Sequence, residues 1–292
     1  MKLIVDYLFS IKNSLNIPVS RRYVVERPIG QEIPKVIYQV YSEHNLPEPL
    51  KRNVDSLKNK NPNWTHRLFN DESMLSYVKS EFPEIYPYYN RINPAYVACR
   101  VDLFRYLLIY NEGGVYFDIK SGANKPLNEI IRIRDLYILS HWSKSEKKIG
   151  HHKGISNPNG ELQQFHILAA KGHPFLRAVI DNVCNNIELY NPIIHGCGGL
   201  SVMMLSGPIA YTNVITPIMD KYPHRLSLDH EELGVYFTCL ENANSHHVVY
   251  KKMHYSQLNS PIITQNFVVN CIFYSTNRIK KFIFSLLTKF TQ

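Results

Sequence analysis

Three charged residues in the middle of the chain have types and spacing that suit the binding of one polar ligand. Asp102 and Arg105 are three residues apart in a segment that we predict to be helical, so their side chains share a face of that helix. Asp118 follows a short apolar segment that we predict to be a strand. Because ligands of open α/β sheets bind outside the carboxyl ends of strands, we expect the three side chains to converge on one ligand.

The elements that must position these residues are one helix, one glycine turn and one strand. Pro94 suits the first turn of the helix, and Asn93 before it is a good N-cap. Gly113 and Gly114 end the helix, since glycine adopts the left-handed backbone conformation that a C-cap needs. Apolar side chains recur at helical spacing and predict an apolar stripe, made by Val97, Val101, Phe104, Leu107 and Leu108.

This stretch resembles the sugar-nucleotide signature of glycosyltransferase family 32, a family that includes mannosyltransferases and capsular polysaccharide enzymes. The family pattern is roughly a-x-x-D-x-x-R-Y-x-x-L-Y-x-x-G-G-x-Y-x-D-x-D. Eight positions match it at the same spacing, namely Asp102, Arg105, Tyr106, Tyr110, Gly113, Gly114, Tyr116 and Asp118. The final acid of this D-x-D motif is replaced by Lys120.

The resemblance implies an α/β protein with a GT-A-type, Rossmann-like single-domain fold that binds a nucleotide sugar. It implies transfer of a sugar, with retention, from a UDP- or GDP-sugar to a glycan or other hydroxyl acceptor. The implied setting is polysaccharide or glycoconjugate synthesis, including capsule synthesis. Asp102 would accept hydrogen bonds from ribose or sugar hydroxyls, and Arg105 would contact the sugar or orient Asp102. The implied catalytic residues are Asp102, Arg105, Asp118 and Lys120.

A divalent metal is the implied cofactor. The diphosphate of a nucleotide-sugar donor leaves with negative charge, which nearby cations stabilise. In the family the D-x-D pair binds the metal, and here Asp118 can still be a ligand of Mn²⁺ or Mg²⁺, with His254 as a second ligand by analogy. Lys120 cannot be a ligand, because an ammonium group only donates hydrogen bonds. Alternatively, Lys120 supplies part of the metal's positive charge from the same face of an extended segment as Asp118.

Further segments of the resemblance add donor-binding residues. The segment IPKVIYQVY is similar to the family's I-P-K-x-I-H-Q-x-W, and its Tyr41 either stacks on the base or packs at the edge of the core. The Gln164 amide suits donor-sugar hydroxyls, and Ser206 and Gly207 would begin a helix whose amides face the ligand. The full set of implied donor-binding residues is Gln39, Tyr41, Gly114, Tyr116, Gln164, Ser206 and Gly207.

The remaining pattern predicts one catalytic domain at residues 33–262. An amphipathic segment, 1–32, precedes it and a basic, apolar segment, 263–292, follows it. Apolar runs predict strands within residues 33–41, 61–71 and 136–140. Helices are expected at 49–60 and 72–82, the second capped by Asp71, and a polar loop over the site is expected at 141–161.

Composition fits a globular protein, with 45% apolar and 20% charged residues in 292. The five cysteines are scattered without a C-x-x-C pair, which argues against a disulfide framework or a zinc site and for reduced thiols in the cytoplasm. Residues 1–17 lack the features of a signal peptide, and neither end has the continuous apolar run of a membrane span.

The net charge of +9 is concentrated at the two ends of the chain. Residues 251–292 carry +6 and residues 1–30 carry +3. Such ends are either attracted to anionic surfaces or simply solvated. We expect peripheral membrane contact rather than nucleic acid, because no nucleic-acid-binding motif accompanies the charge. A second interpretation of the whole chain is an inactive nucleotide-sugar or glycan-binding protein, with Lys120 as the lesion.

Overall fold

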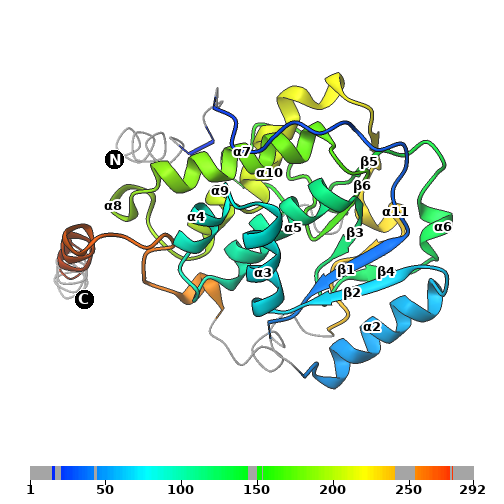
Figure 1. Cartoon of the computed structure of the whole chain (residues 1–292), viewed down its shortest axis with the longest axis horizontal. Helices are drawn as coiled ribbons and strands as arrows, with labels where there is room; N and C mark the ends of the chain where they lie inside the picture. The colour runs from blue at the N-terminus through cyan, green and yellow to red at the C-terminus, as the bar shows by residue number, and fades with distance from the viewer. Residues whose placement is uncertain are drawn as a thin grey trace, which may run out of the picture.

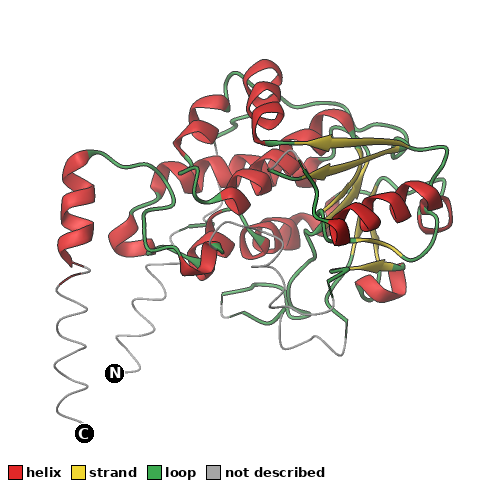
Figure 2. Ribbon diagram, turned by 90° about the horizontal axis from the view of Figure 1, so that it is seen from below, coloured by secondary structure: helices red, strands yellow, loops and turns green. Residues whose placement is uncertain are grey.

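The centre of the molecule is one mixed six-stranded sheet, seen in the computed structural model in Figures 1 and 2. The structure describes residues 15–16, 21–42, 45–143, 150–152, 154–240, 254–276 and 278. The strands lie in the order β2-β1-β3-β6-β5-β7, and a small second sheet pairs β4 with β8. Their bounds are β1 Val36–Val40, β2 Thr65–Phe69, β3 Gly114–Phe117, β4 Gly122–Ala123, β5 Tyr137–Leu139, β6 His166–Ala169, β7 Arg225–Leu226 and β8 Val235–Tyr236.

Parallel pairing brings the carboxyl ends of β1 and β3 together at one edge of the sheet. β1 pairs in parallel with β2 on one side and with β3 on the other, where Ile37 lies opposite Val115. β6 is antiparallel to both β3 and β5. The predicted joining of the first strand and the Asp118 strand in one α/β sheet is therefore confirmed.

Side chains alternate along these strands, so the sheet separates two apolar clusters. Tyr38 and Tyr116 belong to the larger cluster, with the helices α5 and α7. Ile37 and Val115 belong to the smaller cluster, which Leu57 of α2 joins. The helices are α2 Glu48–Lys60, α3 Asp71–Glu81, α4 Tyr86–Arg91, α5 Val97–Glu112, α6 Leu127–Ile130, α7 Pro174–Leu189, α8 Pro192–His195, α9 Gly199–Leu205, α10 Pro208–Ile215 and α11 His230–Leu233, with 3-10 turns η2 Thr216–Lys221 and η4 Tyr255–Gln257.

The central helix, α5, differs from its prediction in two respects. It is buried on every side rather than along one stripe, since α7 and α9 pack against it as well as β3 and β6. It begins at Val97 with Tyr96 at the N-cap position, and the Asn93 side chain instead accepts from the Ala95 N–H of the preceding turn, at 3.0 Å. The predicted glycine ending is confirmed: Gly113 and Gly114 both have positive φ, and a Cβ on Gly114 would lie 2.8 Å from the Val36 carbonyl oxygen.

Two other element predictions can be compared with the structure. The strands expected at residues 33–41, 61–71 and 136–140 are β1, β2 and β5. Asp71 is the first residue of α3 rather than its cap; Asn70 caps the helix, since its side chain accepts from the Ser73 backbone N–H at 2.8 Å. Nearly all of the amphipathic helix expected near the N-terminus and half of the basic C-terminal segment lie outside the described residues.

One helical run, Gly199–Lys221, is long and apolar enough to cross a membrane by length and composition alone. It is divided into α9, α10 and η2 by Ser206 and Gly207, and 56% of its apolar window is buried inside the protein. These features fit helices of a protein core.

Two buried histidines should make the fold sensitive to acid. At the start of α7, His173 Nε2 donates to the Pro223 carbonyl at 3.0 Å while its Nδ1 accepts from the Phe175 N–H, so the ring is neutral. Burial lowers the pKa of His173 to about 4 and that of His166 to about 3. Unfolded histidine binds its proton near pH 6.5, so acidification favours the unfolded state by about 2 kcal/mol per histidine near pH 5.

We expect the free energy of unfolding to fall steadily as the pH is lowered from about 6.5 toward 4. His173→Asn keeps a capping side chain but cannot titrate, so the slope against pH should shrink by about 1.4 kcal/mol per unit between pH 6 and 5. Urea denaturation at a series of pH values measures this slope, with the exposed His151→Asn as the control. An unchanged slope in His173→Asn would contradict the assignment.

Candidate active site

A cavity of about 550 Å³ opens at the carboxyl ends of β1 and β3. One wall is polar and comes from α5, the segment after β3 and the segment before β6. Apolar lining side chains come from residues 95–101 and from α9, and we call them the apolar wall. Lining residues include Tyr41, Asp102, Arg105, Tyr116, Asp118, Lys120, Gln164, Gly207 and His254. The predicted convergence on one ligand-sized space is therefore observed for these residues.

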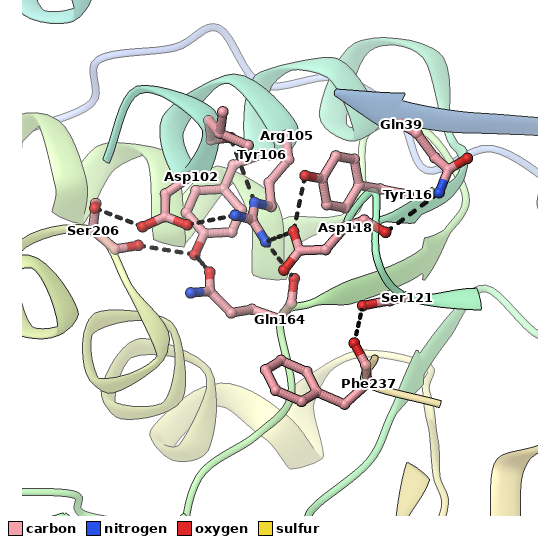
Figure 3. A network of polar contacts seen from close by, with 11 residues as sticks. Gln39, Asp102, Arg105, Tyr106, Tyr116, Asp118, Ser121, Gln164, Ser206 and Phe237 are labelled. Carbon is pink, nitrogen blue, oxygen red and sulfur yellow. Dashed lines mark hydrogen bonds and ion pairs between the residues drawn. The ribbon is translucent and has the colours of Figure 1, made fainter. Parts of the chain in front are cut away.

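The guanidinium of Arg105 lies at the centre of the polar wall, between two carboxylates (Figure 3). It donates to Asp102 Oδ1 at 2.7 Å and lies 3.1 Å from Asp118 Oδ1. A third bond to the Gln164 carbonyl, at 2.9 Å, fixes its plane. Only about 5% of Arg105 is exposed, and its guanidinium carbon lies 4.8 Å from the centre of the Tyr116 ring. The Arg105 cation therefore holds both Asp102 and Asp118 in place.

Asp102 lies behind Arg105 and has its own second partner. It is 3% exposed, and its Oδ2 accepts from the Ser206 hydroxyl at 2.8 Å. Burial raises the pKa of Asp102 to about 6, although Arg105 and Ser206 favour the ionised form. The geometry fits the predicted pairing in which Arg105 orients Asp102 more directly than it fits contact of Asp102 with the ligand's hydroxyls.

Asp118 is the acid that faces the cavity. Its Oδ1 also accepts from the Tyr116 hydroxyl at 3.0 Å, and its backbone carbonyl accepts from Gln39 Nε2 at 3.3 Å. Gln39 is fully buried and does not line the cavity, so it positions Asp118 from below. Tyr41 lines the cavity with its ring packed among Leu50, Val54 and other apolar side chains of a small cluster.

The segment before α10 contacts the same polar network. The Tyr106 hydroxyl lies between the Gln164 side-chain oxygen and the Ser206 carbonyl (Figure 3). The expectation that the Ser206 and Gly207 amides face the ligand is wrong, because both donate to the Val202 carbonyl. Gly207 still lines the cavity, whereas Ser206 and Gly114 act from outside it.

Lys120 lines the cavity, but the predicted extended segment that would place it on the same face as Asp118 is absent. The segment after Asp118 is a turn rather than an extended strand, closed by the Ser121 N–H donating to the Asp118 carbonyl at 2.8 Å. The turn redirects the chain into β4, and Lys120 Nζ lies 3.9 Å from the centre of the Phe237 ring. Burial lowers the pKa of Lys120 to about 8, while nearby Asp118 opposes this shift.

The side chains of the cavity supply only part of the ligands that a divalent metal needs. Asp118 and His254 line the same cavity, and His254 Nδ1 is 2.7 Å from the Ser256 hydroxyl. Within the described ranges, no three His, Cys, Asp or Glu side chains form a group that could hold a metal. Asp118 and His254 therefore fit a metal only if the bound ligand supplies further oxygen atoms.

The sequence did not indicate that a further acidic residue, Glu161, lines the cavity. Glu161 is 5% exposed, lies 3.3 Å from His152 Nε2 and accepts from Trp142 Nε1 at 3.3 Å. All three residues line the cavity together with Tyr255. They come from the expected polar loop, whose sequence carries no signal of which side chains turn inward.

Ten of the residues that line this cavity, among them its central charged residues, lie within a known family pattern. Residues 47–136 match the family described as the glycosyltransferase sugar-binding region containing DXD motif. This match covers Asp102, Arg105, Asp118 and Lys120.

Curated relatives are fungal mannosyltransferases. Inositol phosphoceramide mannosyltransferase 3 of Schizosaccharomyces pombe is 28% identical over 65% of this chain and 47% of its own length. The initiation-specific alpha-1,6-mannosyltransferase of Candida albicans is 25% identical over 65% of this chain and 54% of its own. The chain thus spans about half the length of such relatives. Among solved structures, the PaToxG glycosyltransferase matches 74% of this chain and 80% of its own at 17% identity, with a TM-score of 0.49.

The matched sugar-binding region and the relatives agree with the resemblance drawn from the central stretch. The chain contains, at residues 47–136, a glycosyltransferase sugar-binding region of the DXD type in which Lys120 replaces the second acid of the motif, and it is similar to fungal mannosyltransferases.

Proposed function

We propose that the chain is a glycosyltransferase that moves a sugar from a nucleotide-sugar donor to a hydroxyl of a glycan or related acceptor. The observation that carries this proposal is the buried Asp102–Arg105–Asp118 cluster on the wall of a 550 Å³ cavity, within the matched sugar-binding region. A cavity of that size suits one small organic ligand. The names of the relatives favour mannose as the sugar, with GDP- and UDP-linked donors both open.

The site residues fall into two groups: those that would contact the donor, and those that keep the first group in position. Asp118, Lys120, Tyr41 and Gln164 face the cavity and would contact the donor. Arg105 fixes Asp118, and Asp102 with Ser206 fixes Arg105. Because Arg105 has so many fixed partners, the site is rigid before the ligand binds, which lowers the ordering cost of binding.

A divalent metal, Mn²⁺ or Mg²⁺, forms part of the proposal. Asp118 and His254 would hold it together with oxygen atoms of the donor's diphosphate. When bound, the metal would stabilise the negative charge of the leaving diphosphate. Transfer with retention, and a place in polysaccharide synthesis such as capsule formation, extend the proposal by analogy with the family.

The acceptor would approach along the apolar wall. Ala95, Val97, Val202 and Met203 line the cavity with apolar side chains and belong to this wall. Apolar lining suits an acceptor that carries a lipid or another apolar part beside its hydroxyl. The S. pombe relative is named for an inositol phosphoceramide acceptor, and we extend that acceptor class to this chain.

The test is a screen of UDP- and GDP-sugars for binding by thermal shift and for slow hydrolysis, with and without manganese. We expect one donor to raise the melting temperature and to release its nucleoside diphosphate. Binding without any hydrolysis or transfer would favour the second interpretation, an inactive nucleotide-sugar or glycan-binding protein. Absence of both for all donors would overturn the proposal.

A further inference from the structure

Exposed apolar side chains gather at one end of the molecule, away from the sheet. Figure 1 places α8 at the same end of the molecule as the orange-coloured helix Phe267–Thr276, which lies beyond the main body. Eight large apolar side chains between 36% and 82% exposed come from this helix, from α8 and from the adjoining ends of α7 and α9. We call them the end cluster: Leu189, Ile193, Ile194, Leu200, Phe267, Val268, Ile272 and Tyr274.

The helix of the end cluster has an apolar outer face. Phe267, Val268 and Ile272 are exposed at helical spacing, while Phe273 on the other side is 2% exposed. No Asp, Glu, Lys or Arg occurs from residue 264 to residue 277. Exposed apolar patches of this kind mark interaction surfaces in soluble proteins.

The charge of the chain beyond this helix indicates what covers the face. Residues 277–292 carry Arg278 and three lysines and no acidic residue. An apolar face followed by basic residues complements an anionic bilayer, which accepts apolar side chains between its headgroups and attracts cations. A second copy of the chain fits poorly, because pairing two such faces would bring like charges together.

We infer that the end cluster docks the protein on the surface of an anionic membrane. The helix α9 links this surface to the cavity, since Leu200 belongs to the end cluster while Val202 and Met203 line the apolar wall. Docking through the end cluster would hold that wall near the bilayer. The inference rests on surface residues alone and stands whether or not the chain transfers a sugar.

The test is sedimentation of the full chain with vesicles of phosphatidylcholine alone or mixed with phosphatidylserine. The variant Phe267→Glu/Ile272→Glu places two charges in the end cluster. Its matched control is Val25→Glu/Ile133→Glu, because these side chains are 75% and 95% exposed and lie outside the cluster. We expect wild type and control to bind the mixed vesicles equally. The affinity of the end-cluster variant should be lower by about ten-fold or by a larger factor.

A fluorophore on the exposed Cys271 gives a second readout, since its emission should shift to the blue when the helix enters the bilayer interface. Equal vesicle binding by the two double variants would overturn the inference. It would also be overturned if wild type ignored vesicles but formed a dimer that the end-cluster variant lost, because the face would then join two copies.

Discussion

Asp118→Asn is expected to lower the kcat/KM of donor turnover by about a hundred-fold to a thousand-fold. Asp118 is the acid of the Arg105 cluster that faces the cavity, and its Oδ1 accepts from Tyr116 and pairs with Arg105. An amide in its place keeps the size but removes the charge. The variant therefore loses a ligand for the proposed metal and leaves Arg105 paired with Asp102 but no longer with a carboxylate at position 118.

The stability of this variant must be separated from its activity. Arg225 and Asp135 form a similar ion pair at 2.7 Å, with Asp135 7% exposed, outside the residues that line the cavity. Asp135→Asn is thus a matched control for losing one partner of an aspartate–arginine pair. Asp135→Asn should lower the melting temperature and keep turnover, whereas Asp118→Asn should lose far more turnover than a similar fall in melting temperature explains. A folded Asp118→Asn protein with nearly normal turnover would show that this carboxylate has no part in the reaction.

The central part of the site could be predicted from the sequence because its rules are local. Asp102 and Arg105 meet through helical periodicity, and Asp118 is exposed at the sheet edge because a glycine pair ends α5 directly before β3. These relations depend on neighbours a few residues apart. They hold whatever the remainder of the chain does.

The parts that were missed depend on contacts between distant residues. Strand β6 is a short apolar run, and only its antiparallel pairing with β3 and β5 makes it a strand. Asn93 is of a residue type that commonly caps helices, but α5 begins four residues later. The backbone N–H of Asn93 donates to the carbonyl of Ile262, which is distant in the sequence. Glu161 and His152 face the cavity because a long loop folds back, which no local pattern encodes.

Lys120 changes the charge of the site in a way that can be compared with a metal. The two carboxylates, Asp102 and Asp118, are balanced in formal charge by Arg105 and Lys120. Replacing the second acid of the motif by lysine adds two positive charges, which is the charge of one divalent cation. The cluster of Asp102, Arg105, Asp118 and Lys120 is therefore neutral in formal charge without a metal, whereas with an acid at position 120 it would be neutral only with a bound divalent cation. This comparison predicts a shallow dependence of donor binding on metal.

Removing the positive charge of Lys120 should make donor binding depend more strongly on metal. Lys120→Met keeps an apolar chain against Phe237 but no cation, so binding of a nucleoside diphosphate without metal should weaken by about ten-fold to a hundred-fold. Lys120→Asp restores the acid of the motif and should make binding and turnover depend strongly on manganese. Lys120→Arg should stay close to wild type, because it retains the cation beside Asp118.

Manganese titrations of donor binding and of turnover, run on wild type and the three variants with a chelator as the zero point, distinguish these cases. Calorimetric binding of the diphosphate separates a loss of donor affinity from a loss of chemistry. Phe237→Leu serves as the control, since it removes the ring under the ammonium group but leaves the charge. If all the titration curves superimposed, Lys120 would be a lysine in the cavity wall with no part in donor binding, and the charge balance would not govern the metal requirement.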